Sequence, residues 1–115
     1  VLGEARSPTC GSTLALSLGT DETGRIETLG LRVRACAVGQ AAAAIFARHA
    51  VGRDLAGMER MLASLETWLS GEGPLPDWPD LKVIAAARDF PGRHGAMLLP
   101  WKAAIAALSK APAAR

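Results

Sequence analysis

Two stretches in the first third of the chain alternate between apolar and polar side chains. Residues 13–19 alternate leucines with smaller or polar residues, and residues 29–35 alternate leucine and valine with Arg32 and Arg34. A period of two residues is typical of a β-strand with one buried and one solvent-exposed face. The intervening segment DETGR contains Gly24, which can adopt the positive φ that tight turns require. The sequence therefore predicts an antiparallel β-hairpin.

One apolar residue breaks the alternation of the second strand. Ile26 is out of phase with the leucines that follow it. An extra residue in one strand shifts the phase in this way, so we expect a β-bulge or a strand end near Glu27.

After Cys36 the apolar period becomes that of an α-helix. A run rich in small residues predicts a helix over residues 38–50, which the stop signal Gly52 terminates. A second helix, spanning residues 54–69, begins at Asp54, a typical N-cap residue, and has apolar residues at helical spacing.

The last third of the chain contains two further predicted helices. A short helix is expected over residues 80–88, and the final helix carries the sequence AMLLPWKAAIAAL. Pro100 lies within that sequence, so it either occupies the first turn of the helix or kinks it. The tail 110–115 is expected to fray. The pattern as a whole predicts an α+β domain over residues 1–115, with a small antiparallel sheet of two to three strands packed against four to five helices.

Composition excludes several classes of protein. The chain has 115 residues, enough to bury a core, and a formal net charge of +2. Its basic residues are dispersed rather than gathered in a stripe with aromatics, which argues against nucleic-acid binding. We identify no transmembrane helix or signal peptide, and expect no membrane association. The chain begins with Val1 rather than Met, which suggests that a leading segment was removed or lost. Two cysteines do not form a disulfide framework, so we expect a reducing cytoplasm.

The two cysteines are expected to lie at the same end of the hairpin. Cys10, in the turn sequence SPTCGS, precedes the first strand, and Cys36 follows the second. In an antiparallel hairpin the start of one strand lies beside the end of the other. Cys36 also begins a helix, where the free amides and the helix dipole favour a thiolate.

Two thiolates do not complete a usual metal site. Zinc and iron–sulfur clusters take about four ligands. Ser12 and His94 are the weak candidates to complete a set, and His49 is a less plausible one. Three alternatives stay open: the cysteines are incidental, they form a disulfide, or one of them is an enzymatic nucleophile with His94 as its base.

Two other groups of side chains have a structural and a functional interpretation. Trp68, Trp78 and Trp101 are better explained by packing than by stacking on a ligand. Arg32 and Arg34 are better explained as the solvent-exposed face of a strand than as a docking site for an acidic partner.

Three ordered blocks of the sequence resemble a known family. These blocks are SPTCGSTLALSL, then RACAVGQAAAAIFARHAVGRDL after the hairpin, then DFPGRHGAMLLPWKAAI. Together they resemble the U-type iron–sulfur cluster scaffolds (IscU, SufU and the N-terminal domain of NifU). The last block and the segment WLSGEGPLPDWPDL are similar to the SufU-type branch. The resemblance covers nearly the whole chain, apart from the N-terminal helix of the family.

The departures from the family pattern concern its ligands. The aspartate that follows Cys-Gly in the family is Ser12 in this chain, and the third cysteine of the family falls on Ala96. The residue before that cysteine falls on Gly95, one position from His94. Only Cys10 and Cys36 match the usual ligand set.

The resemblance implies a function without enzymatic activity. It implies a scaffold or sulfur acceptor that binds iron, zinc or a 2Fe–2S cluster, or no metal because the third cysteine is absent. It also implies a cysteine desulfurase as sulfur donor and recipient apo-proteins or cluster carriers as further partners. Cys10 is the candidate sulfur acceptor and Cys36 the second thiolate ligand. The alternative is a degenerate homologue that binds and regulates its partners without a cluster of its own.

Overall fold

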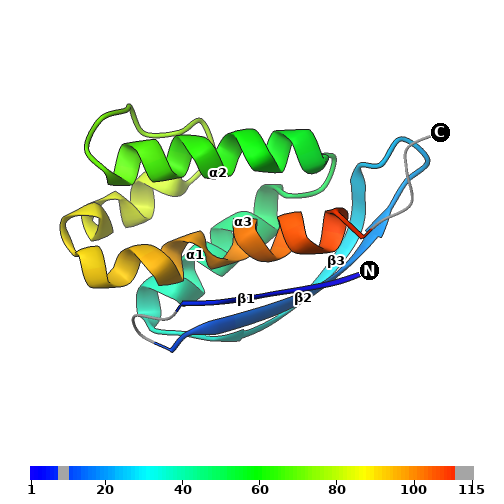
Figure 1. Ribbon diagram of the computed structural model, residues 1–115, viewed down its shortest axis with the longest axis horizontal. Coiled ribbons are helices and arrows are strands. Elements are labelled where there is room, and N and C mark those ends of the chain that lie inside the picture. Colours follow the sequence, from blue (N-terminus) through cyan, green and yellow to red (C-terminus); the bar gives the residue numbers. More distant parts are fainter. Residues whose placement is uncertain (8–10, 111–115) are drawn as a thin grey trace.

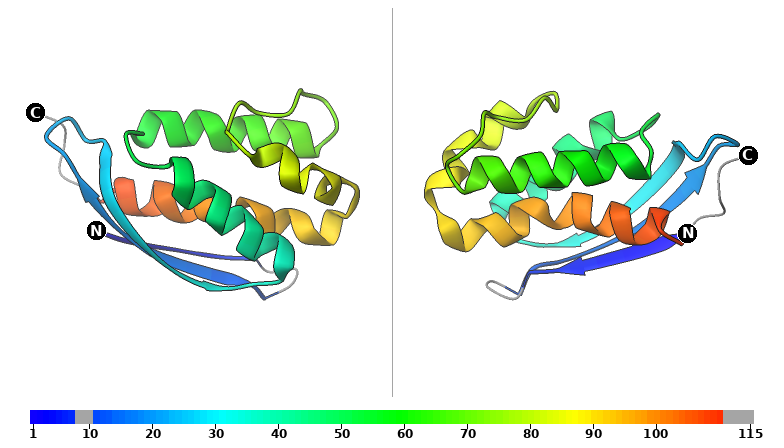
Figure 2. Two further views of the ribbon diagram at one scale, coloured as in Figure 1. Left: turned by 180° about the vertical axis from the view of Figure 1, so that it is seen from behind. Right: turned by 45° about the horizontal axis from the view of Figure 1, so that its top comes forward.

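The protein has two layers, a three-stranded antiparallel sheet and a layer of helices. The computed structural model describes residues 1–7 and 11–110. The strands are arranged in the order β1-β2-β3, and the helices all cover the same face of the sheet (Figure 1 and Figure 2). The predicted α+β class is confirmed.

The predicted hairpin is formed by β2 (Thr13–Thr20) and β3 (Ile26–Arg34). Its turn is organised by Asp21, whose Oδ1 accepts hydrogen bonds from the amides of Thr23 and Arg25 and from the Thr23 hydroxyl. Gly24 has a φ of 84°, so a residue without a Cβ is favoured there.

The predicted bulge lies at Glu27. Thr28 pairs with Gly19 and Ile26 pairs with Thr20, so Glu27 has no partner in β2. Because the extra residue changes the phase of the strand, the side chain of Ile26 points into the core and is only 1% exposed.

A third strand, β1 (Leu2–Arg6), pairs with β2 and was not predicted as a particular segment. Gly3 lets this strand approach helix α3 (His94–Leu108) very closely. A Cβ at Gly3 would overlap the carbonyl oxygen of Ala103 and lie 2.7 Å from the amide nitrogen of Ala107. The close packing of β1 on the helix at Gly3 therefore depends on contacts that are remote in sequence.

The first two helices begin and end within one residue of their predicted bounds. Helix α1 spans Ala37–His49 and helix α2 spans Leu55–Leu69. Asp54 is the N-cap of α2, and its Oδ1 accepts a hydrogen bond of 2.9 Å from the amide of Gly57. The N-cap prediction is confirmed.

The predicted short helix is a 3₁₀ helix, η1 (Leu81–Asp89), rather than an α-helix. A second short 3₁₀ helix, η2 (Pro91–Arg93), leads directly into α3. Pro91 therefore starts the final helical region, and Pro100 lies inside α3, where it is fully buried. The proposal that Pro100 occupies the first turn is wrong, since α3 begins at His94.

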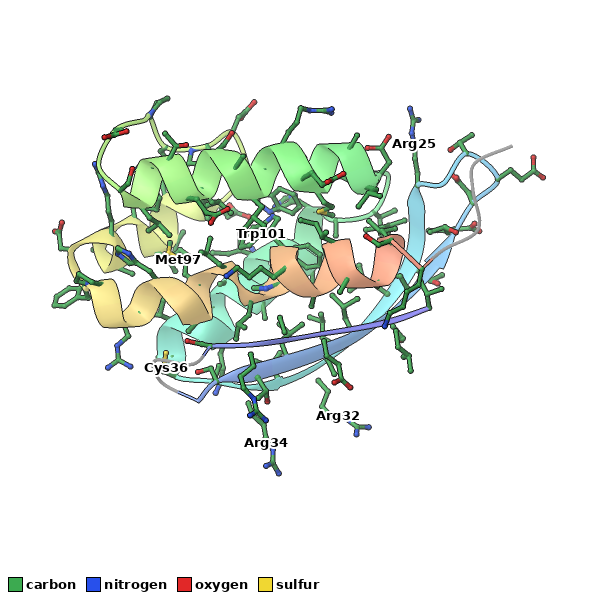
Figure 3. All side chains as sticks on the ribbon, viewed as in Figure 1. Arg25, Arg32, Arg34, Cys36, Met97 and Trp101 are labelled. Carbon is green, nitrogen blue, oxygen red and sulfur yellow. The ribbon has the colours of Figure 1, made fainter. Side chains whose placement is uncertain are left out.

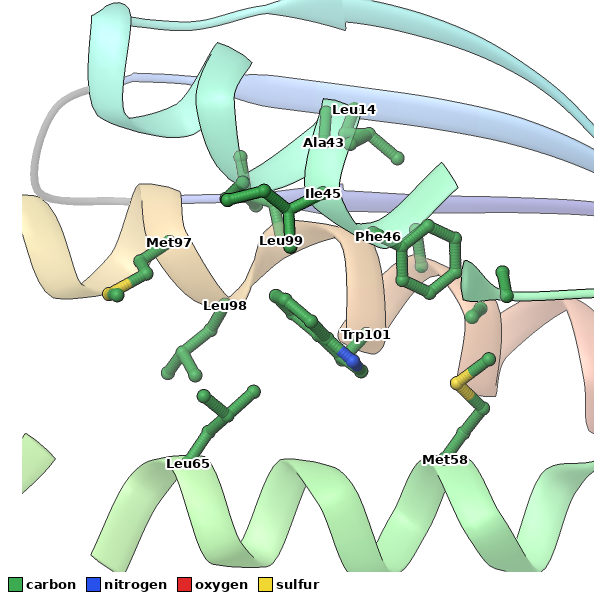
Figure 4. Packing of buried hydrophobic residues seen from close by; sticks show 14 of the residues in the cluster. Leu14, Ala43, Ile45, Phe46, Met58, Leu65, Met97, Leu98, Leu99 and Trp101 are labelled. Carbon is green, nitrogen blue, oxygen red and sulfur yellow. The ribbon is translucent and has the colours of Figure 1, made fainter. Parts of the chain in front are cut away.

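The core lies between the sheet and the helices, with an aromatic cluster at its centre (Figure 4). Phe46 stacks on Trp78 with the ring centroids 5.7 Å apart, and Trp101 meets both rings edge-on. The indole nitrogen of Trp78 donates a hydrogen bond to the carbonyl of Ile45, 33 residues away in the chain. All three tryptophans are buried, as the packing interpretation predicts.

Within the part of the chain that the structure describes, no helix has the length and apolar character needed to span a membrane. The predicted frayed tail lies outside the described residues, with the exception of Lys110. The ammonium group of Lys110 donates a hydrogen bond to the carbonyl oxygen of Leu2.

Candidate thiol site

The strand register brings the two cysteine-containing segments to one end of the sheet. Thr13 pairs with Arg34, so Gly11, which precedes Thr13, and Cys36, which follows Arg34, both lie beyond this end. Figure 3 places Cys36 at this end, where β3 gives way to α1. Cys10 itself lies outside the described residues, so its side chain is not placed.

Cys36 is half-buried at the N-cap position of α1 and forms no disulfide with a residue that the structure describes. Its carbonyl oxygen accepts the first helical hydrogen bond, from the amide of Gln40 at 2.9 Å. The side chain of Gln40 donates a second hydrogen bond to the carbonyl of Ala35. The backbone on both sides of the thiol is therefore held by Gln40, while the thiol itself makes no capping hydrogen bond.

The base of the loop between β1 and β2 is tied together by two serines. The amide of Ser7 donates to the carbonyl of Ser12, and the amide of Gly11 donates to the carbonyl of Ser7. Ser7 is 1% exposed and Ser12 is 5% exposed. The sequence analysis considered Ser12 but missed Ser7, because nothing in SPTCGS shows that the side chain of Ser7 is buried.

The first turn of α3 packs into the same region. A Cβ at Gly95 would overlap the hydroxyl of Ser7, so this glycine leaves room for the buried serine. Ala96 is completely buried, and its Cβ would stand 3.3 Å from a Cβ built on Gly39 of α1. Ala96, the position that matches the third cysteine of the family, therefore lies against Gly39, which is three residues after Cys36.

His94 lies at the start of α3 but is engaged with its own neighbourhood. Its Nε2 forms a 2.7 Å hydrogen bond to the carbonyl oxygen of Arg88, and since a carbonyl only accepts, Nε2 carries the proton. Nδ1 is therefore the ring nitrogen through which His94 would bind a metal in this conformation.

His49 lies at the opposite end of α1 from Cys36. The 13 residues of α1 span roughly 20 Å at the helical rise, too far for both side chains to bind one metal ion. His49 instead bonds to the carboxylate of Asp80 at 2.9 Å, with Arg48 at 3.6 Å from the same oxygen. The hydrogen bond from His49 is the main cause that lowers the pKa of Asp80.

The described residues alone do not group three metal-binding side chains. No cluster of three histidine, cysteine, aspartate or glutamate residues able to hold a metal occurs in residues 1–7 and 11–110. The region around Cys36 contributes one placed thiol, that of Cys36, and has Ala96 at the position of the third cysteine of the family. This donor set does not by itself fit a cluster, which takes about four ligands.

Comparisons with known proteins find similar folds among solved structures. No protein-family model matches the sequence, and no curated protein is similar to it in sequence. Among solved structures, the chain is similar to the N-terminal part of a nitrogen-fixing NifU-like protein from Brucella abortus. The two share 27% sequence identity with a TM-score of 0.86, over 96% of this chain and 81% of that one.

The resemblance to the U-type scaffold family is confirmed. A second similar structure is a putative iron–sulfur cluster assembly scaffold protein for the SUF system from Fervidobacterium islandicum. It is 21% identical, with a TM-score of 0.80 over 93% of this chain and 79% of that one, and so shows the shared fold.

Proposed function

We propose that this U-type chain is a scaffold or sulfur acceptor of iron–sulfur cluster assembly. The observation that supports this most directly is the corner where Cys36, the base of the Cys10 loop and Ala96 converge. The family pattern has two of its cysteines at the positions of Cys36 and Ala96, and the third, at Cys10, falls in the loop between Ser7 and Gly11. The similar NifU-like and SUF-system proteins support the same assignment.

The proposed sulfur-transfer step uses Cys10 as the acceptor. The Cys10 thiolate attacks the terminal sulfur of a persulfide on a cysteine desulfurase. A new sulfur–sulfur bond forms at Cys10 while the bond within the donor persulfide breaks, and the donor cysteine leaves as a thiolate. The exchange needs no external oxidant or reductant, since a persulfide is consumed and a persulfide is produced.

The scaffold role requires ligands in addition to the two cysteines. Cys10 and Cys36 are the proposed thiolate ligands for iron, zinc or a 2Fe–2S cluster. Nδ1 of His94, the Ser12 hydroxyl, a small thiol or a second subunit would complete the coordination. The chain then passes the cluster, as cargo, to recipient apo-proteins or cluster carriers in the cytoplasm.

The test is metal and sulfide content after anaerobic purification and reconstitution. We expect iron and acid-labile sulfide in wild type, reduced to background in Cys10→Ser and Cys36→Ser. His49→Ala is the matched control, since His49 lies at the far end of α1 and should retain full iron and sulfide. Incubation with a desulfurase and labelled cysteine should place sulfur on wild type and not on Cys10→Ser.

The second candidate is a degenerate scaffold that binds and regulates its partners. The replacement of the third cysteine by Ala96 favours it, because the corner then lacks a full ligand set. It predicts that wild type retains neither metal nor labelled sulfur and still binds the desulfurase, with equal affinity for wild type and Cys10→Ser. Loss of binding in Cys10→Ser would contradict this second candidate.

A further inference from the structure

The face of the sheet opposite the helices is uncovered and carries an uneven distribution of charge. Figure 3 shows Arg32 and Arg34 projecting from this face, away from the helices. Arg6 belongs to the same group, since Arg6 and Arg34 both pair with Thr13 and cross-strand partners share a face. All three arginines are exposed, and none forms an ion pair with a described carboxylate.

A shallow furrow runs along this face beside the arginines. One part, of about 420 Å³, has a floor of Ala15, Ser17 and Gly30, with Arg32 at its edge. A second hollow adjoins it, shares Glu4 and Ala15 with it, and continues to Arg6 and Thr13. The furrow therefore leads along the strands toward the end of the sheet where Cys36 lies. Glu4 pairs with Ala15 and lies on the same face, so three arginines against one carboxylate leave this part of the face net positive.

The opposite end of the sheet is acidic. The hairpin tip carries three exposed carboxylates, on Asp21, Glu22 and Glu27. The eight residues of β2 separate the two ends by roughly 24 Å, about three Debye lengths at physiological salt. The tip carboxylates consequently do not neutralise the arginines, and a charged ligand experiences opposite potentials at the two ends.

We propose that this face docks an extended, acidic segment of a partner protein, which lies in the furrow with its carboxylates on Arg6, Arg32 and Arg34. The small floor residues leave room for the side chains of an extended chain. The guanidinium group of an arginine donates paired hydrogen bonds to a carboxylate. The acidic hairpin tip repels the same segment, so the segment is held at the end of the sheet near Cys36. Among the described residues of its three strands, the face has no aromatic side chain of the kind on which single-stranded nucleic acid stacks.

This inference does not depend on either cysteine carrying sulfur or metal. Its test is therefore a binding measurement with a probe that cannot react with a thiol. The probe is a fluorescent eight-residue peptide that alternates glutamate with alanine, compared with peptides that alternate glutamine or lysine with alanine. Fluorescence anisotropy at 50 mM and 300 mM salt gives the dissociation constants.

We expect the glutamate peptide to bind most tightly and to weaken at the higher salt concentration. The triple variant Arg6→Gln, Arg32→Gln, Arg34→Gln should weaken binding about tenfold or more. Ser17→Trp, which fills the furrow at an exposed position without changing charge, should weaken it similarly. The charge-matched control Arg25→Gln, Arg60→Gln, Lys82→Gln alters exposed residues away from the furrow and should bind like wild type.

Circular dichroism and thermal melting of each variant establish that it is folded. Three results would overturn the inference: no binding of the acidic peptide, equal loss in the control triple variant, or unchanged binding in Ser17→Trp. Tighter binding of a single-stranded oligonucleotide that displaces the peptide would also overturn it, in favour of a nucleic-acid surface.

Discussion

Ala96 in the first turn of α3 lies directly against Gly39 in the first turn of α1. A Cβ added to Gly39 would be 3.3 Å from the Cβ of Ala96 and 2.6 Å from that of Ala35. The contact joins two helices that are far apart in sequence, and both residues lie in the first turn of their helix. A side chain at position 96 is therefore held close to the segment that carries Cys36.

Restoring a thiol at this contact should increase metal binding. In Ala96→Cys we expect the iron retained after anaerobic reconstitution to rise about twofold or more, because a third thiolate joins Cys10 and Cys36. Iron and acid-labile sulfide analysis measures this. Ala107→Cys is the control, since Ala107 is equally buried in α3 but lies near Gly3 in β1. Equal iron in both variants would mean that position 96 has no access to the site.

The approach of β1 to α3 should make Gly3 intolerant of a side chain. Gly3→Ala would place a methyl group against the backbone of Ala103, and we expect a loss of about 3 kcal/mol or more in the free energy of unfolding. Urea denaturation measures the loss. Gly92→Ala is the control, because its Cβ would meet no atom within 4 Å, and it should change stability by less than about 1 kcal/mol. Similar values for the two variants would contradict the close approach.

The contact between His49 and Asp80 should make stability depend on pH at the acid end. The lowered pKa of Asp80, due first to the hydrogen bond from His49, means that the native state favours the charged carboxylate. Its contribution is complete above the ordinary aspartate value of about 3.9 and is lost as the pH falls through the lower native value. Asp80→Asn should thus be less stable than wild type at pH 7, with the difference disappearing at low pH.

Asparagine is the informative substitution because Asp80 has a φ of 69°, a left-handed conformation that asparagine tolerates well. Urea denaturation at a series of pH values from 7 down to 2.5 measures the effect. Asp89→Asn removes an exposed aspartate that forms no ion pair with a described residue, and should show no such trend. A constant deficit of Asp80→Asn at every pH would contradict an electrostatic origin.

Arg53 should stabilise the aromatic cluster through its guanidinium plane. Its guanidinium carbon lies 3.8 Å from the centroid of the Trp78 ring, and its Nε donates to the carbonyl of His49. Arg53→Ala should cost about 1–2 kcal/mol, and Arg53→Lys should not recover it, because lysine has neither the plane nor the Nε donor. Urea denaturation followed by tryptophan fluorescence measures both variants. Arg60→Ala, at an exposed position of α2, should change stability by less than about 0.5 kcal/mol.

Much of the fold was predictable from the sequence because the signals are local. The alternation in residues 13–19 and 29–35 specifies strands with one buried face, and Asp54 caps the helix that follows it. The phase change at Ile26 located the bulge, since one added residue in a strand moves every following side chain to the opposite face of the sheet. The ordered blocks around Cys10, Cys36 and Phe90 were sufficient to identify the family resemblance.

Tertiary structure alone decided the features that depend on contacts between remote residues. Five residues of β1 are too few to identify a strand, and its inner face packs against α3 because Gly3, its one buried residue, fits against that helix. Pro100 lies in the interior of α3 because the helix begins at His94, and a proline there cannot donate the helical hydrogen bond to the carbonyl of Ala96. Its ring is fully buried, a contact that the local sequence does not reveal. The partner of His49 was likewise undetermined by sequence, because its contact with Asp80 joins residues 31 positions apart. The chain's local patterns determined its elements, whereas the packing of small residues determined which side chains meet at the site.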